Sequence, residues 1–195
     1  MEVRERLLEA ALRVFEEAGS RGATTRRIAA EAGVNEITLF RHFGSKGALL
    51  SEALALATRN DQVVRLPEVP VEPGEELMVW CRERLDHLRR SSPMIRTCMG
   101  EMEQTPEMRD RAGATPGRLA MELTEYLGRL RDAGMADAEV DPSAAAAMLM
   151  GAMFADAMGR DFMPERYSYS PEEAPAKYVA LLLRAIGAVP AGTPA

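Results

Sequence analysis

A short segment, residues 35–46, carries the chemistry that is most specific to one kind of partner. At the 100° advance of an α-helix, Ile37 and Arg41 lie on the same outward side. Thr38 and Phe40 flank them. A guanidinium can donate to O6 and N7 of one guanine, and an aliphatic side chain can contact a thymine methyl group. An isoleucine beside an arginine on an outward face is therefore typical of a helix that enters a major groove.

Polar groups around this helix are placed to contact a phosphate backbone. From residue 20 to 47 the chain holds five basic and two acidic side chains, a local net charge of +3. Basic side chains and the first-turn N–H groups of helices are common phosphate contacts. The candidate DNA-binding residues are Thr25, Arg26, Arg27, Asn35, Glu36, Ile37, Thr38, Phe40, Arg41, His42 and Lys46.

The same stretch predicts two short helices joined by a tight turn. Thr25 is expected to cap the first helix, because a threonine hydroxyl accepts from free first-turn N–H groups. Gly33 follows where a helix ends with positive φ. Asn35 is expected to cap the second helix, with Leu39 and Phe43 facing the local core. This arrangement is a helix-turn-helix.

The run T-T-R-R-I-A-A-E-A-G-V-N-E-I-T-L-F-R-H-F-G-S-K resembles the DNA-binding module of TetR-type transcriptional regulators over roughly residues 4–50. The resemblance implies a two-fold dimer and a small-molecule pocket in a second, helical half. The family often has a small residue where Ile37 stands and usually a tyrosine where Phe40 stands, so no operator sequence is carried over. The alternative is a three-helix packing unit without affinity for DNA.

Composition favours an all-α protein without a cofactor. The 195 residues are rich in alanine and leucine and show no period-two alternation. No run approaches about 18 apolar residues, and charged residues at the start are unlike a signal peptide, which indicates a cytoplasmic protein. Cys81 and Cys98 have no ligand-like spacing, so free thiols are expected rather than a disulfide or a metal site.

Charge is distributed unevenly between two expected domains. Residues 1–60, the helix-turn-helix DNA-binding domain, hold nine basic and eight acidic groups, a net charge of +1. Residues 61–195, the helical effector-binding and dimerisation domain, hold fifteen and twenty-two, a net charge of −7. The acidic part would keep the body of the protein away from phosphates.

Helices are expected at 2–18 and, after the helix-turn-helix, from Ser45 to about residue 60, followed by a proline-rich linker over 65–74. Capping residues before prolines predict later helix starts. These pairs are Ser92-Pro93, Thr105-Pro106, Asp141-Pro142 and Ser170-Pro171, the last with Glu173 as a capping box. The expected helices are 74–90, 93–102, 106–133, 142–160 and 171–187. Gly113, Pro116 and Gly117 are expected to kink or split the 106–133 helix.

Methionines concentrate in the second domain, where a methionine-lined cavity could fit apolar guests; core filling is the alternative for each of them. The candidate effector-binding residues are Trp80, Arg84, His87, Met121, Met148 and Asp156. Asp156 stands alone among apolar residues, and a lone buried carboxylate needs an arginine, a ligand or a partner subunit. Arg84 is one possible mate.

The last two helices are candidates for a homodimer contact, because each has a stripe that suits helix packing. The candidate residues are Ala147, Gly151, Ala155 and Gly159 at spacings of four, and Tyr178, Leu181, Leu182 and Ala185. The alternative is that both stripes serve the core of the monomer.

Three functions are compared. The first is a ligand-responsive regulator, expected to be a repressor, that binds a palindromic operator as a homodimer and is released by a small, largely apolar effector. The second is an architectural or interaction protein with the same DNA reader and no effector. The third is an enzyme. The sequence disfavours it, because it has only two histidines, no glycine-rich phosphate loop and no HExxH motif.

Overall fold

The computed structural model describes residues 2–60, 64–102 and 114–188. All regular secondary structure within these ranges is helical, which confirms the all-α prediction. The chain divides into two compact units. Unit 1 comprises residues 1–62 and 91–115, and unit 2 comprises residues 63–90 and 116–195.

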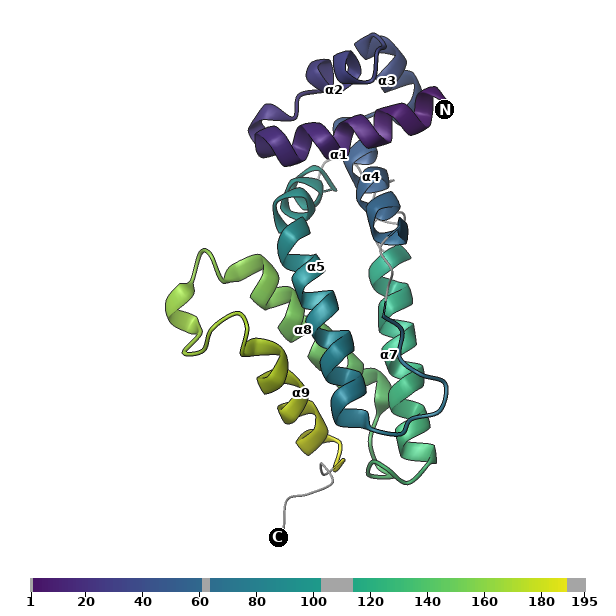
Figure 1. Cartoon of the computed structure of the whole chain (residues 1–195), viewed down its shortest axis with the longest axis vertical. Coiled ribbons are helices and arrows are strands. Elements are labelled where there is room, and N and C mark those ends of the chain that lie inside the picture. The colour runs from purple at the N-terminus through teal and green to yellow at the C-terminus, as the bar shows by residue number, and fades with distance from the viewer. Residues whose placement is uncertain (1, 61–63, 103–113, 189–195) are drawn as a thin grey trace. The chain divides into compact units, whose positions relative to one another are not determined.

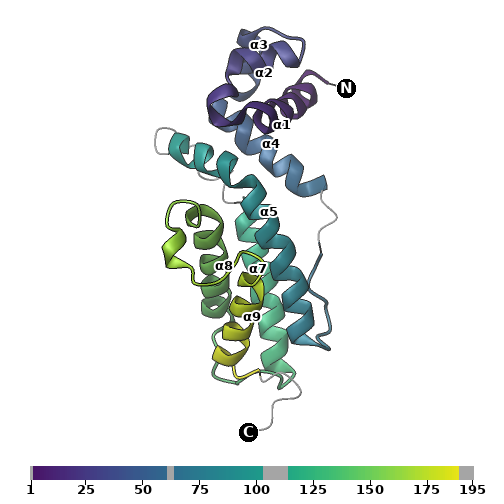
Figure 2. The same cartoon turned by 60° about the vertical axis from the view of Figure 1, so that its left-hand side comes forward.

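Unit 1 is built on four helices. These are α1 (Val3–Gly22), α2 (Thr25–Glu31), α3 (Glu36–Phe43) and α4 (Lys46–Asn60). Helix α1 packs against α2 and α4, and α3 packs against both α2 and α4. Figures 1 and 2 show α2 and α3 on the same side of α1. Gly19 interrupts the helical backbone of α1, close to the predicted end at residue 18.

The core of unit 1 follows the predicted apolar stripe of α1. Leu7, Ala11 and Val14 are buried there together with Ile28 of α2 and Leu39 of α3. Leu49, Leu50 and Ala53 of α4 complete the same cluster, as do Met94 and Cys98 from the last part of α5. Unit 1 therefore has a packed core of its own, which holds the outward face of α3 in a fixed orientation.

Unit 2 contains the remaining helical segments. They are α5 (Pro73–Met102, up to residue 90), α7 (Ala114–Asp132, from residue 116), α8 (Pro142–Gly159), the 3₁₀ turn η1 (Pro164–Arg166) and α9 (Ala174–Ala185). Helix α8 packs against α9. One apolar cluster, with Trp80, Leu127, Leu149 and Leu183 among its members, joins the four helices.

The predicted linker is irregular from residue 64 to 72, as expected, and hydrogen bonds hold it against the helices of unit 2. Leu66 is buried and donates its N–H to Glu122 of α7 at 2.9 Å. Arg129 donates to the carbonyl of Pro67 at 3.2 Å. The linker is therefore an ordered strap on unit 2 rather than a flexible tether.

One predicted helix start is wrong. Pro93 lies inside α5, which continues from Pro73 to Met102 without the expected break. The side chain of Ser92 is buried and accepts a hydrogen bond from Arg96 instead of capping a new helix. A proline on an exposed side costs one backbone hydrogen bond but does not force an end to the helix when both flanks pack well.

One other predicted helix start is confirmed, and at a second the predicted capping box forms but the helix begins later than predicted. Asp141 caps α8 by accepting from Ser143 and Ala144. Ser170 and Glu173 form the reciprocal bonds of a capping box, although α9 itself begins at residue 174. Thr105-Pro106 and Gly113 lie outside the described residues. Pro116 and Gly117 lie within α7, which is described from Ala114.

The two cysteines are free and buried, Cys81 in unit 2 and Cys98 in unit 1. Burial raises the pKa of the Cys81 thiol to about 12, so it stays protonated at neutral pH. Among the described residues no cluster of three metal-ligating side chains occurs, and no described helix is long and apolar enough to cross a membrane.

Candidate functional site

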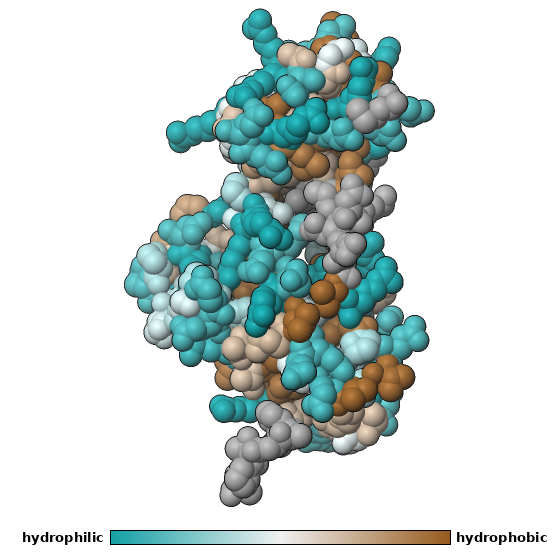
Figure 3. Space-filling model, viewed as in Figure 1, coloured by the Kyte–Doolittle hydropathy of each residue, from teal (hydrophilic) through white to brown (hydrophobic). Residues whose placement is uncertain are grey.

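The outward edge of α3 is exposed while its opposite side is anchored in the core. Leu39 is fully buried and Phe43 is buried to 6% exposure. Ile37, by contrast, is 78% exposed and Phe40 is 45% exposed. Arg41 is also exposed. In the view of Figure 3 the surface of unit 1 is mostly hydrophilic with scattered hydrophobic residues. The side chain of Ile37 is therefore accessible to a partner molecule.

Local sequence fixes where the two helices of the motif begin and end. Asn35 caps α3 as predicted, accepting from Thr38 N at 2.8 Å. The predicted cap at Thr25 is wrong by one residue, because Thr24 accepts from Arg27 N at 3.2 Å. Gly33 has φ of +68° between the helices, a left-handed conformation that side chains strain to adopt.

Moving the cap to Thr24 frees Thr25 for a different role. Its hydroxyl donates to the carboxylate of Glu36, which joins the first turn of α2 to the first turn of α3. Both residues were predicted to contact DNA. In the structure each is half-buried, and their side chains contact one another. The pair sets the geometry of the two helices.

The predicted basic residues differ in their exposure and in whether a carboxylate pairs with them. The guanidinium groups of Arg26 and Arg41 are exposed and have no carboxylate partner within residues 2–60, 64–102 and 114–188. Arg27 instead donates to Glu17 of α1 at 2.9 Å. His42 is exposed, with its ring 6.3 Å from that of Phe43. Lys46 is half-buried at the start of α4.

Arg4, which the sequence analysis did not single out, supports α3. Arg4 of α1 forms an ion pair with Glu52 of α4, and its guanidinium lies 5.3 Å from the ring centroid of Phe43. It therefore connects α1, α4 and the buried end of α3. Its partners lie 39 and 48 residues further along the chain, and no short-range pattern indicates them.

In unit 2, Asp156 is the centre of a buried hydrogen-bond network. Its side chain has no solvent exposure, and Oδ1 accepts from Nε and a terminal nitrogen of Arg89 at 3.0 and 2.7 Å. Oδ2 accepts from Arg160, one turn later, and from the hydroxyl of Tyr178 at 2.8 Å. The expected arginine partner is thus present twice. Arg84, the mate considered from the sequence, donates to the carbonyl of Val64.

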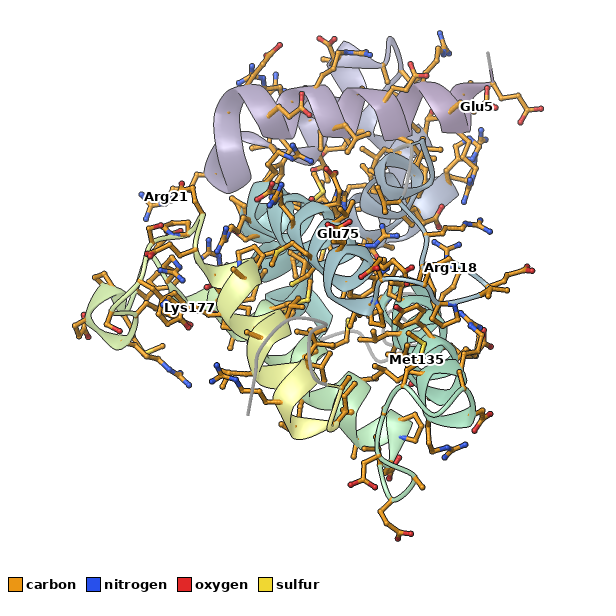
Figure 4. All side chains as sticks on the ribbon, turned by 60° about the horizontal axis from the view of Figure 1, so that its bottom comes forward. Glu5, Arg21, Glu75, Arg118, Met135 and Lys177 are labelled. Atoms are coloured by element: carbon orange, nitrogen blue, oxygen red, sulfur yellow. The ribbon has the colours of Figure 1, made fainter. Side chains whose placement is uncertain are left out.

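The network also holds the segment between α8 and α9. Arg89 donates to the carbonyl of Pro171 at 2.9 Å, and Arg160 donates to that of Tyr169 at 2.7 Å. The guanidinium of Arg160 stacks 4.2 Å from the ring centroid of Tyr167. Lys177, labelled in Figure 4, reaches from α9 to within 5.5 Å of the Tyr169 ring centroid. Residues 160–173 are therefore fastened at several points.

Charge pairing shifts the ionisation of this network. Burial pushes the pKa of the Asp156 carboxyl upward, but hydrogen bonds from Arg160, Arg89 and Tyr178 outweigh it and hold that pKa below its ordinary value. The hydrogen bond to Asp156 raises the pKa of Arg160. Burial raises the pKa of Tyr178. Asp156 is consequently a carboxylate at neutral pH, with its charge balanced inside the protein.

The predicted effector-binding residues do not form one group. Trp80 is fully buried, and Arg84, 7% exposed, places its guanidinium 5.7 Å from the Trp80 ring centroid. His87 is half-buried on the next turn. Met121 and Met148 are 60% and 65% exposed, so they lie outside this packed interior. The pattern of methionines alone does not distinguish inward from outward positions.

The predicted dimer-contact residues also separate into two sets. On α8, Ala147 and Gly151 are exposed, and Ala155 and Gly159 are half-buried. On α9, Tyr178 and Leu182 face the core of unit 2 and are removed from the surface available to a partner. Leu181, 63% exposed, and Ala185 remain open. Phe154 of α8, which was not predicted, is 40% exposed.

A helix-turn-helix with an exposed apolar and basic edge, followed by a helical unit, is the architecture of a DNA-binding transcriptional regulator. Residues 7–53 match the family described as bacterial regulatory proteins, tetR family, and residues 75–185 match the AefR-like transcriptional repressor C-terminal domain. The chain belongs to the TetR family.

Similar proteins fall in the same class. The HTH-type transcriptional repressor AcnR of Corynebacterium diphtheriae is 37% identical over 87 residues, 45% of this chain and 42% of that protein. AcnR of Corynebacterium glutamicum is 39% identical over 71 residues, 36% of this chain and 35% of that protein. The chain therefore aligns with less than half the length of these curated relatives.

Solved structures match over nearly the whole chain. A putative TetR-family regulator from Mesorhizobium loti superposes with a TM-score of 0.71 at 20% identity, covering 94% of this chain and 96% of that one, a likeness of fold alone. FadR of Thermus thermophilus, a TetR-family repressor in complex with lauroyl-CoA, superposes with a TM-score of 0.66 at 25% identity, covering 98% of both chains.

Proposed function

We propose that the protein is a ligand-responsive transcriptional repressor that binds a palindromic operator as a homodimer and is released by a small, largely apolar effector. The observation that carries the proposal is the exposed Ile37/Arg41 edge of α3, opposite the buried Leu39 and Phe43. In the major groove Arg41 would donate to a guanine, and Ile37 would contact a thymine methyl group. Arg26 would contact a phosphate.

Release by an effector is supported by the architecture of relatives. FadR of Thermus thermophilus is a repressor whose solved complex contains lauroyl-CoA, and SmeT of Stenotrophomonas maltophilia represses a multidrug efflux pump. In this chain the effector would bind in unit 2, which has one apolar cluster. It would favour a conformer that binds the operator less tightly, by as much as its own affinity differs between the two states.

Homodimerisation is supported by apolar residues left open on α8 and α9. Met148 and Phe154 of α8 and Leu181 of α9 are at least 40% exposed, on helices that pack against one another. Gly151 between them allows close approach of a second helix. A dimer would present two copies of α3, and two half-sites one helical turn apart, about 34 Å, would form a palindrome.

The test is to select DNA from a random pool with the full chain and to measure affinity for the winning sequence across salt concentrations. We expect a palindrome and a linear fall of log affinity with log salt. Arg41→Ala should cost about 1–3 kcal/mol and relax the preference at one base pair of each half-site. Arg118→Ala, at an exposed arginine of α7, is the matched control and should change neither. Unchanged site preference in Arg41→Ala would refute the proposed reading edge.

A further inference from the structure

A buried donor in the core of unit 2 has no acceptor among the described residues. Trp80 is the single tryptophan of the chain and has no solvent exposure. Its indole Nε1 makes no hydrogen bond to any described residue. Native proteins leave few buried donors unsatisfied, because the group loses its bond to water and gains none in return. An acceptor from outside the chain would complete this site.

The same core satisfies a comparable donor internally. Tyr126 of α7 is also fully buried, and its hydroxyl donates to Glu76 of α5 at 2.5 Å. That bond and the burial of the ring raise the pKa of Tyr126, so the hydroxyl stays a donor. A missing acceptor is therefore not a general property of the buried aromatic residues of this core.

The surroundings of Trp80 select the chemistry of the acceptor. The guanidinium of Arg84 lies 5.7 Å from the ring centroid and is 7% exposed, so a positive charge stands beside the indole within the protein. Hydrogen bonds to an ionised oxygen are stronger than those between neutral groups, and a cation nearby favours them further. A negatively charged oxygen fits this position better than a neutral one.

The rest of the cluster indicates what kind of molecule carries this oxygen. Its other members are mostly aliphatic, among them Leu77, Leu85, Leu123, Leu127, Leu130 and Met153. A water molecule is stable in a protein interior when it has two to four polar partners, and these six side chains offer no hydrogen-bonding N or O atom. A ligand whose charged oxygen is attached to an apolar group would instead pack that apolar group against the aliphatic side chains.

We propose that Trp80 Nε1 and the Arg84 guanidinium form the binding site for the carboxylate of an apolar carboxylic acid, which is the effector. This inference rests on the proposed function in one respect, namely that unit 2 binds an effector, and it adds the class of compound and the atom that recognises it. The indole N–H donates to one carboxylate oxygen, and the positive charge of Arg84 stabilises the anion.

A single tryptophan makes the first test direct. In a ¹H–¹⁵N correlation spectrum of the full chain, the indole N–H gives one cross-peak, which can be followed on titration with decanoate below its micelle concentration. We expect saturable movement to lower field and slower exchange with water. Decyltrimethylammonium has the same alkyl chain and no acceptor, and should leave the peak in place. A peak that ignores decanoate, or responds equally to both compounds, overturns the proposal.

Variants provide the second test. Trp80→Phe removes the donor, and Tyr126→Phe removes another buried donor of the same core as the matched control. By calorimetry, Trp80→Phe should bind decanoate about tenfold more weakly or worse, as expected for one hydrogen bond to a charged group, whereas Tyr126→Phe should bind as the wild type does. Equal weakening in both variants overturns the site. If Trp80→Phe does not fold, the wild-type spectrum still decides.

The failure of this inference can be separated from failure of the proposed function. Operator binding by the wild-type chain without any ligand tests the DNA reader alone. A chain that binds a palindrome while its indole peak ignores decanoate refutes the carboxylate site and leaves the regulator intact. A chain whose indole peak responds to decanoate but which binds no DNA supports the site and refutes the regulator.

Discussion

Thr25 donates its hydroxyl to the carboxylate of Glu36, so the start of α2 is tied to the start of α3 across the turn of the motif. Eleven residues separate the two. Because the caps of these helices are Thr24 and Asn35, neither Thr25 nor Glu36 is needed to begin its own helix. The bond instead fixes the angle at which α3 leaves the motif, and with it the direction of the Ile37/Arg41 edge.

Thr25→Val removes this bond with little change in volume. We expect the free energy of operator binding to weaken by about 1 kcal/mol, the usual net value of one hydrogen bond, with an unchanged salt dependence since no cation is lost. Glu36→Gln is the control, because the amide oxygen still accepts from Thr25 and one negative charge near DNA disappears. It should bind the operator at least as well as the wild type. Equal losses in the two variants would show that Glu36 contacts DNA itself.

Arg26 and Arg27 are neighbours with different expected contributions. Arg26 has no carboxylate partner within the described ranges, whereas Arg27 is paired with Glu17 at 2.9 Å. A cation that neutralises one phosphate contributes about one unit to the slope of log affinity against log salt. We therefore expect Arg26→Ala to lower the slope by about one and Arg27→Ala to lower it less. The measurement is titration of labelled operator at several salt concentrations, and a larger effect at Arg27 would contradict the assignment.

Much of unit 1 was predictable because its signals are local. The caps at Asn35 and Ser45, the positive φ of Gly33 and the inward side of α3 each depend on residues within one or two turns. Thr24 and Thr25 are equally good caps by type, so the sequence alone could not decide between them. The exposure of Ile37 follows directly from the burial of Leu39, which lies about 200° away around the helix.

Unit 2 was less predictable because its decisive contacts are distant in sequence. Arg160 stands four residues after Asp156, a spacing that places both on one side of a helix, and could have been named from it. Arg89 lies 67 residues before Asp156, and nothing near it indicates that contact. Helix packing likewise decided that Tyr178 and Leu182 face the core while Leu181 faces outward.

Asp156 is expected to be the side chain of unit 2 that is least tolerant of neutralisation. Asp156→Asn would remove the buried carboxylate that Arg89 and Arg160 share, and breaking a buried ion pair from one side costs about 3–5 kcal/mol of folding free energy. Chemical denaturation of purified protein measures this value. Asp132→Asn, whose side chain is 69% exposed and paired with Arg131, is the control and should change stability by about 0.5 kcal/mol or less.

The same carboxylate predicts a dependence of stability on acid. The pKa of Asp156 is lower in the folded protein than in the unfolded chain, so the unfolded state binds the proton more readily. Its contribution is complete above the unfolded pKa of about 3.9 and is lost as pH falls through the folded value. The stability difference between wild type and Asp156→Asn should therefore shrink below about pH 4. A difference that stays constant down to pH 2 would argue against an ionised Asp156.

Gly151 offers a way to test the dimer without disturbing the monomer. It is exposed on α8, and a Cβ built at this position meets no atom of the described residues within 4 Å. Gly151→Glu should leave helix content unchanged and shift the molecular mass by light scattering from dimer to monomer, since a charge would be buried against a second helix. Gly128→Glu, at a half-buried glycine of α7 where a Cβ likewise meets no described atom within 4 Å, is the control and should stay dimeric. If both variants remain dimeric, the dimer contact does not include the surface of α8 around Gly151.

Pro93 is expected to weaken α5, and its removal should stabilise the protein. Proline has no N–H to donate to the carbonyl of Arg89 four residues earlier, and the helix nevertheless continues to Met102. Because Pro93 is exposed, Pro93→Ala restores that bond without leaving a cavity in the core. We expect the free energy of unfolding to rise by about 1–3 kcal/mol, below the full cost of a helical proline since the unfolded chain also gains freedom. Pro142→Ala, at the first position of α8 where an N–H would have no intrahelical acceptor, is the control and should change stability little. A fall in the melting temperature of Pro93→Ala would mean that the proline holds a bend which the surrounding packing requires.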